Sequence, residues 1–334
     1  MKVAQLNGPN QEYTIVEREI PNPKRNQVRI KVEACGVCHS DSMLRQLPEN
    51  MYPAVPGHEV VGRVDAIGEG VTGWSVGQKV GVGWHGGHCF HCESCRRGDF
   101  SNCEEVQTCG ISYDGGFAEF MVAPDDAVVA IPEELNSAEA APLLCAGITT
   151  FNALRNNIVR AGSLVAIQGV GGLGHLAIQY ANKLGYEVIA LARGEERAEL
   201  AHELGAHHYF DTTKEGWQES VNALGGVTVA LATAPNAQAI SALTTILAPN
   251  GKVVDVAVPA EPVEIQAGVM IGGGKSFQGW YSGTPVDGED TTKFSKLQGI
   301  KPMIETYPLE KINEAYEKMM AGKTRFRAVI VFSE

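Results

Sequence analysis

The residues best suited to metal chemistry are four cysteines that lie close together in the chain. They are separated by intervals of two, two and seven residues: Cys89, Cys92, Cys95 and Cys103. Four thiolates fill the tetrahedral shell of Zn²⁺ and leave no position for a substrate, which is typical of a structural site. Disulfides or unrelated thiols are the alternative explanation. The spacing favours a structural zinc site, so the catalytic residues are expected elsewhere.

Composition restricts the class of protein. The 334 residues can bury a large core and form two domains. The net charge is −12 and no basic cluster is present, so nucleic acid is not an expected partner. No apolar run reaches the roughly 18 residues of a membrane span, and the first ten residues lack the apolar region of a secretory signal. Eight cysteines without an export signal indicate a reducing compartment, and we expect a cytoplasmic protein.

Hydrophobic patterning changes along the chain. Residues 28–34 alternate as in a half-buried strand, and glycines between short apolar runs over 57–82 predict an irregular, barrel-like sheet. Later segments predict strands over 163–168, 187–192, 207–210, 227–233 and 252–258, and helices over 173–184, 195–204, 214–224 and 236–247. Such alternation is typical of parallel βαβ units in a doubly wound (Rossmann) sheet.

The end of the chain departs from this alternation. It predicts a helix over 309–320 and a strand over 328–332 that returns to the first domain. We expect an α/β protein with a β-rich, zinc-binding catalytic domain formed by residues 1–147 and 282–334. The dinucleotide-binding domain is expected over residues 148–281.

A glycine-rich turn lies between the strand and the helix that open the second domain. Gly169, Gly171 and Gly174 are the three glycines of a GxGxxG motif, and Gly172 stands at one of its variable positions. Glycines let the backbone turn sharply and approach a pyrophosphate, whose charge then meets the helix N-terminus. Helix-on-strand packing alone would also use such glycines. The strand–turn–helix context favours a dinucleotide site.

The choice of dinucleotide depends on the end of the strand over 187–192. An acid there would hold a ribose 2′-hydroxyl, but the strand is followed by Arg193. A guanidinium can bind a 2′-phosphate in bidentate fashion, and Arg197 lies one helical turn further on. Glu195 and Glu196 lie nearby and argue for the alternative, in which Arg193 is a solvated residue at a helix start. We favour NADP(H) over NAD(H).

Three further residues with metal-binding side chains are spread along the chain: Cys38, His58 and Cys145. Taken singly, each has another explanation, because buried cysteines often pack in cores and a lone histidine is often a hydrogen-bonded polar group. No spacing rule links residues so far apart.

Together, these motifs resemble those of the zinc-dependent medium-chain alcohol dehydrogenases, especially the tetrameric microbial branch. The resemblance covers essentially the whole chain in order, including residues 114–119 and the final strand. It implies that Cys38, His58 and Cys145 hold a catalytic zinc with one position open, giving two zinc ions per chain. Such an ion polarises the oxygen of an alcohol or aldehyde. The short connection from Cys103 to Gly115 resembles tetrameric relatives, so a homo-oligomer, with a tetramer favoured, is expected.

The resemblance also implies roles near the catalytic metal. Asp41 is similar to the carboxylate that orients the zinc-binding histidine, and Glu59 to the acid that approaches the metal during ligand exchange. Ser40 resembles the hydroxyl that accepts the alcohol proton and passes it to the cofactor ribose. Many relatives continue this relay through a histidine where this chain has Met43, and a thioether cannot carry a proton. The relay beyond Ser40 is therefore undefined.

Further residues are similar to cofactor and substrate contacts of the family. His39 and Arg327 resemble contacts to the pyrophosphate, Thr149 a contact near the nicotinamide carboxamide, and Leu173 a residue behind the nicotinamide ring. Trp84 resembles a wall of the substrate pocket, although a core tryptophan would look the same. The remaining cysteines, Cys35 and Cys109, are expected to be structural. The histidines near the zinc lobe are expected at the surface: His85, His88 and His91.

The sequence favours an NADP(H)-dependent zinc dehydrogenase that interconverts primary alcohols and aldehydes. Cys145 argues against a polyol dehydrogenase, which often lacks this ligand, and Cys38 with His58 argues against a zinc-free quinone or enoyl reductase. The ligand set and Ser40 together argue against a non-enzymatic nucleotide-binding or lens-type structural protein. Short aliphatic, benzylic and cinnamyl alcohols all remain possible substrates.

Overall fold

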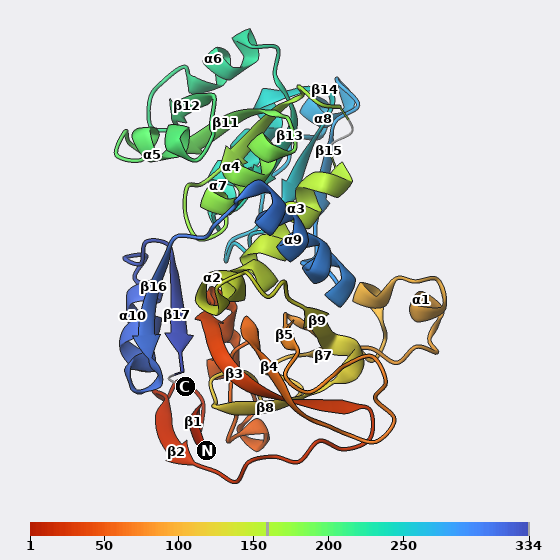
Figure 1. Cartoon of the computed structure of the whole chain (residues 1–334). Coiled ribbons are helices and arrows are strands. Elements are labelled where there is room, and N and C mark those ends of the chain that lie inside the picture. The colour runs from red at the N-terminus through yellow and green to blue at the C-terminus, as the bar shows by residue number, and fades with distance from the viewer. Residues whose placement is uncertain (158–159, 333–334) are drawn as a thin grey trace. The chain divides into compact units, whose positions relative to one another are not determined.

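The computed structural model describes residues 1–157 and 160–332, and the chain divides into two compact units (Figure 1). The β-rich unit comprises Met1–Ile148 and Gly283–Glu334, and the α/β unit comprises Thr149–Ser282. Each unit contains its own main sheet. The expected fold class, a β-rich domain combined with a doubly wound parallel sheet, is confirmed.

The α/β unit is built on a parallel sheet with the strand order β12-β11-β10-β13-β14-β15. The strands are β10 (Leu164–Gln168), β11 (Glu187–Ala192), β12 (His208–Asp211), β13 (Val227–Ala232), β14 (Leu247–Asp255) and β15 (Ser276–Gly279). The chain moves outward from β10 to one edge and then from β13 to the other, so the strand order reverses between them. In such sheets, ligands bind beyond the carboxyl ends of the strands at this reversal. The glycine turn follows β10 directly.

The helices of this unit connect successive strands: α4 (Gly174–Lys183), α5 (Ala198–Glu203), α6 (Trp217–Ala223), α7 (Ala237–Leu243) and α8 (Ala267–Ile271). Several boundaries differ from expectation: α6 begins three residues after the predicted start at residue 214, and β14 begins five residues before the predicted start at residue 252. Helix α5 begins three residues later than predicted. Gly194 adopts φ +75°, and this keeps the residues between β11 and α5 in a turn. Helix α7 ends earlier, where the hydroxyls of Thr244 and Thr245 bond the carbonyls of Ser241 and Ala242.

The β-rich unit contains a sheet with the order β16-β17-β3-β4-β5-β9, and β8 also pairs with β3. Its strands are β3 (Gln27–Val37), β4 (Val60–Ile67), β5 (Lys79–Val82), β8 (Phe120–Pro124), β9 (Val128–Ala130), β16 (Ile304–Pro308) and β17 (Arg327–Val331). The final strand β17 lies antiparallel to β3, with Ala328 opposite Val37, which confirms the predicted return to the first unit. Helix α10 (Ile312–Met320) precedes it. This return brings Arg327 to the end of β3 that leads to Cys38.

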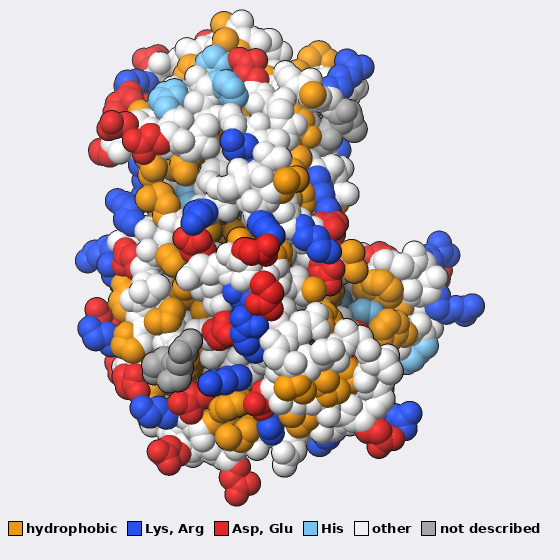
Figure 2. Space-filling view, in the orientation of Figure 1, with side chains coloured by type: hydrophobic (Ala, Val, Ile, Leu, Met, Phe, Trp, Pro, Cys, Tyr) orange, Lys and Arg blue, Asp and Glu red, His pale blue; other side chains and the backbone are white. Residues whose placement is uncertain are grey.

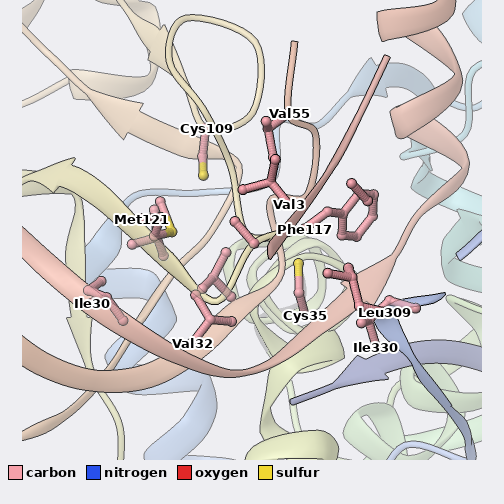
Figure 3. Close-up of a cluster of buried hydrophobic side chains, with 14 of the residues drawn as sticks. Val3, Ile30, Val32, Cys35, Val55, Cys109, Phe117, Met121, Leu309 and Ile330 are labelled. Atoms are coloured by element: carbon pink, nitrogen blue, oxygen red, sulfur yellow. The ribbon is translucent and has the colours of Figure 1, made fainter. Parts of the chain in front are cut away.

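A buried apolar cluster holds the β-rich unit together (Figure 3). Ile30 and Val32 of β3 contribute to it together with Phe117 and Met121. Cys35 belongs to the same cluster and is fully buried, as is Cys109, with 1% exposed. Apolar burial of this kind stabilises a fold by about 25 cal/mol per Å². This core therefore stabilises strand β3, whose end leads to Cys38.

The surface carries both signs of charge. Figure 2 shows Lys and Arg side chains intermingled with Asp and Glu side chains on the face drawn. Several form exposed ion pairs, such as Arg63 with Glu133 at 2.9 Å, which contribute little to stability individually. Among the helices that the structure describes, none combines the length and apolar character needed to cross a membrane.

Two glycines of the nucleotide turn provide a test of its packing. A Cβ on Gly174 would lie 1.8 Å from the carbonyl oxygen of Gly169, whereas a Cβ on Gly171 would meet no atom within 4 Å. We expect Gly174→Ala to lower the free energy of unfolding by about 1–3 kcal/mol through overpacking. Gly171→Ala, the matched control, should change it by less than about 1 kcal/mol. Thermal or urea unfolding without nucleotide measures both, and equal effects would contradict this packing.

Candidate metal and nucleotide sites

The structure brings together the metal-binding side chains that are spread along the sequence. Cys38 follows β3 directly, His58 precedes β4, and Cys145 lies between the 3-10 helix η5 (Ala141–Leu144) and helix α3 (Ala146–Asn157). Together with Glu59, each offers one ligand atom, and these atoms lie within 4.8 Å of one another. The Sγ atoms of Cys38 and Cys145 are 3.8 Å apart, which matches two Zn–S bonds of about 2.3 Å at a tetrahedral angle.

The Asp41 carboxylate holds two of these ligands in place. One oxygen accepts a hydrogen bond from the backbone N–H of Cys38 at 2.8 Å, and the other lies 3.1 Å from Nδ1 of His58. Asp41 is fully buried. Because Nδ1 is occupied, Nε2 of His58 is left to face the sulfurs, and it has no hydrogen-bond partner among the described residues. A metal ion fits this orphaned nitrogen.

Glu59 is held beside the cluster by an ion pair. Its Oε1 pairs with the guanidinium of Arg327, and both side chains are buried. Burial raises the pKa of Glu59 to about 7, although Arg327 opposes the shift. The carboxylate occupies space that a Cβ on Gly36 would fill, since that atom would lie 1.8 Å from Oε2. Sequence reasoning missed this pair, because residues 268 positions apart leave no local signal.

The electrostatics of the cluster fit a cation. Hydrogen bonding with Cys145 holds the pKa of Cys38 well below its ordinary value, and His58 contributes while burial opposes. The same pairing and burial hold the pKa of Cys145 well above it. Ionisation of either thiol thus opposes ionisation of its neighbour. A divalent cation would allow both to ionise, and the N-terminus of α3 beside Cys145 favours a thiolate.

The sulfurs of the other cluster also converge to within 4.8 Å: Cys89, Cys92, Cys95 and Cys103. The turns between them are tight, and the short helix α1 (Glu93–Arg96) begins directly after Cys92. Backbone N–H groups donate to three of the sulfurs: that of Cys92 to Cys89 at 3.3 Å, that of Cys95 to Cys92 at 3.5 Å, and that of Glu105 to Cys103 at 3.3 Å. Such donors stabilise thiolates, so this cluster fits a structural zinc with four sulfur ligands.

The prediction that all three neighbouring histidines lie at the surface is wrong for two of them. His85 is 3% exposed, and the side chain of His88 is 5% exposed. The two rings hydrogen-bond at 3.0 Å, and that of His88 stacks on Phe100 at 4.1 Å. Burial lowers the pKa of His85 to about 4, so it is neutral at pH 7. Phe100, from the four-cysteine segment, thus packs against the His88 ring. The side chain of His91, by contrast, is 72% exposed.

The 3-10 helix η1 (His39–Gln46) carries the predicted relay residues. Ser40 is partly buried two residues after Cys38, while His39 is exposed and Met43 is 54% exposed. The ring of Trp84 meets that of His58 edge to face at 4.9 Å. Trp84 is only partly buried.

The glycine turn joins β10 to α4 in the α/β unit. Gly169 adopts φ +96°, which only glycine takes easily, and the open space beside Gly171 is where a phosphate could approach the backbone. Leu173 immediately precedes the helix and is partly buried. Thr149 donates a hydrogen bond to the hydroxyl of Ser282 at 3.1 Å in the same unit. These features fit a dinucleotide.

The two arginines expected near the cofactor ribose differ in their contacts. Arg193 is exposed directly after β11 and makes no ion pair among the described residues. Arg197 instead donates to the carbonyl of Val170 in the glycine turn. Glu195, which would oppose a phosphate, pairs with Lys214.

Comparisons with known proteins agree with this pair of sites. Residues 24–133 match the family model of the alcohol dehydrogenase GroES-like domain, and residues 172–297 match that of the zinc-binding dehydrogenases. Alcohol dehydrogenase patD of Penicillium expansum is 46% identical over 318 residues, which cover 95% of this chain and 93% of that protein. The chain therefore belongs to the zinc-dependent medium-chain alcohol dehydrogenase family. It is an enzyme whose family uses zinc and a nicotinamide cofactor on small alcohols or aldehydes.

Solved structures of the same fold contain either nicotinamide cofactor. CAD from Helicobacter pylori, complexed with NADP(H), has a TM-score of 0.87 at 27% identity over 99% of this chain and 97% of that one. The short chain alcohol dehydrogenase rspB from E. coli CFT073, complexed with NADH, has a TM-score of 0.90 at 27% identity over 99% of each chain. The fold alone thus leaves the cofactor preference open.

Metal analysis should separate the two clusters. We expect one zinc ion in each cluster of the wild-type chain, with Cys103→Ala losing one ion and Cys145→Ala the other. Cys103→Ala should also lower Tm by several degrees, because binding of a structural zinc contributes directly to folding free energy. Elemental analysis by mass spectrometry together with thermal unfolding measures both effects. A wild-type chain that retains a single ion after purification in zinc would contradict the assignment.

Proposed function

We propose that the chain is an NADP(H)-dependent zinc alcohol dehydrogenase and aldehyde reductase that acts on primary alcohols and their aldehydes. The convergence of Cys38, His58 and Cys145 carries the proposal, together with the lack of a hydrogen-bond partner for Nε2 of His58 in the described part of the chain. Zinc held by these residues supplies a Lewis acid that polarises the substrate oxygen. NADP(H) supplies the partner for hydride transfer. The presence of Cys145 in the cluster argues against a polyol dehydrogenase.

The residues around the cluster orient the metal ligands, transfer the proton and contact the cofactor and the substrate. Asp41 keeps His58 in the tautomer that presents Nε2, and it fixes the backbone of Cys38. Ser40 would accept the hydroxyl proton of the alcohol during oxidation while its own proton passes to the cofactor ribose, and the transfer would run in reverse during reduction. Arg327 holds Glu59 beside the ligands, where its carboxylate would be available to a bound metal. Arg327 and His39 would contact the pyrophosphate of a bound cofactor. Trp84 shields the substrate beside His58.

The preference for NADP(H) rests on the segment after β11. Arg193 is exposed and makes no ion pair among the residues that the structure describes, so its guanidinium is available to a 2′-phosphate, and no acid ends the strand. The pairing of Glu195 with Lys214 offsets one of the acidic groups that would repel this phosphate. The alternative is the same reaction with NAD(H), which Glu196 would favour. A cytoplasmic location and a tetramer are proposed from the sequence and its family resemblance.

Removal of a metal ligand tests the catalytic assignment. We expect Cys145→Ala to lower kcat by at least about a hundredfold, since the loss of outer partners alone costs ten- to a hundredfold. Cys109→Ala is the matched control, because it removes a buried thiol that lies outside the cluster. Steady-state rates with a panel of primary alcohols and aldehydes measure both variants. Appreciable activity in Cys145→Ala would show that the ligand set is wrong.

The cofactor preference is tested by Arg193→Ala. The loss of charge-assisted hydrogen bonds should raise KM for NADPH by about ten- to a hundredfold and leave KM for NADH nearly unchanged. Arg25→Ala is the control, since Arg25 is an exposed arginine whose ion pair with Glu69 is long, at 3.8 Å. Both cofactors are assayed at one ionic strength. A wild-type enzyme with a lower KM for NADH would overturn the proposed preference.

A further inference from the structure

We infer that Tyr209 and Asp211 are positioning residues for recognition of the cofactor 2′-phosphate: they clamp Gly194 from β12 and hold the adjacent Arg193 in place. This inference rests on the proposed use of NADP(H). Strand β12 lies beside β11 at the edge of the parallel sheet (Figure 1), with Asp211 opposite Ala192. The last residues of β12 therefore lie against the turn that follows β11.

Both backbone polar groups of Gly194 are bound by side chains from β12. The phenol of Tyr209 donates to the carbonyl of Gly194 at 2.6 Å, and the N–H of Gly194 donates to Oδ1 of Asp211 at 2.8 Å. The neighbouring carbonyl of Ala192 accepts from the backbone N–H of Thr212 at 2.8 Å. The backbone on both sides of Arg193 is thus held by β12 and by the residue that follows it.

Asp211 is itself held firmly. Its Oδ1 also accepts from the backbone N–H of Thr213 at 2.9 Å and from the Thr213 hydroxyl at 2.7 Å, and the residue is 8% exposed. These donors, those from Thr213 first and then the N–H of Gly194, lower the pKa of Asp211. The carboxylate is therefore ionised and bound within the turn.

The arrangement explains how one exposed arginine can discriminate between cofactors. An arginine on a mobile turn loses conformational freedom on binding, and this entropic cost lowers the affinity further when the backbone must also be ordered. Gly194 at φ +75° gives the turn its shape, and the two side chains of β12 keep that shape. Only a ligand that bonds Arg193 gains from this rigidity, so the clamp should affect the 2′-phosphate and not the rest of the nucleotide.

The experiment compares two probes, 2′,5′-ADP and 5′-AMP, by calorimetry on the full-length zinc-loaded protein. Their Kd ratio reports the 2′-phosphate alone. We expect Tyr209→Phe and Asp211→Ala to reduce the wild-type preference for 2′,5′-ADP by about three- to tenfold. Asp211→Asn keeps an acceptor oxygen and should retain most of the preference. Ser220→Ala, which removes a hydroxyl that donates from α6 to the carbonyl of Gly216, should leave the preference unchanged.

A double-mutant cycle shows whether the clamp acts through Arg193. In the Arg193→Ala background, Tyr209→Phe should leave the Kd ratio unchanged. Equal weakening of both probes, an unchanged ratio in the single variants, or an equal loss with and without Arg193 would each overturn the inference. A wild-type protein that binds both probes equally would instead refute the use of NADP(H), and the clamp with it. Tyr209→Phe removes one oxygen from a partly exposed side chain, so unfolding of Asp211→Ala would not prevent the test.

Discussion

The Asp41 carboxylate ties together the two segments of the β-rich unit that carry Cys38 and His58. One oxygen holds the backbone at the end of β3, and the other holds the imidazole that precedes β4. Since Asp41 is fully buried and bonded at both oxygens, neither segment can move without leaving a buried charge unpaired. The placement of the Cys38 backbone and the orientation of His58 Nε2 both follow from this interaction. A single acid thus preorganises two of the three proposed metal ligands.

The same region concentrates negative charge away from water. Asp41, Glu59 and the thiols of Cys38 and Cys145 can all carry it, while Arg327 provides the balancing cation. Burying unpaired negative charge costs free energy, so a further positive charge would stabilise the cluster. A divalent ion with soft and imidazole ligands meets this need. The sulfurs of the lobe reach a closed arrangement of four, whereas the buried cluster offers two sulfurs and one imidazole with Glu59 beside them. This difference is the physical basis for assigning a structural and a catalytic role.

Local patterns determined much of what could be predicted. The strand–turn–helix around the GxGxxG motif, the alternation that gives a parallel sheet and the short intervals in the cysteine lobe all depend on residues that are neighbours in the chain. Backbone geometry and hydrophobic periodicity therefore suffice to recognise them. The helix boundaries at α5 and α7 were less accurate, because a glycine at positive φ and two threonine hydroxyls shifted them. The family resemblance, and not spacing, linked Cys38, His58 and Cys145.

The sequence by itself determined the fold class, the glycine turn and the presence of a zinc-type cysteine motif. Only the tertiary structure decided that Cys38 and Cys145, 107 positions apart, share a site, and that Arg327 pairs with Glu59 across 268 positions. It also decided that His85 is buried and that β12 clamps the turn carrying Arg193. Such contacts depend on which strand ends meet when the sheets assemble, and local propensity carries no information about this.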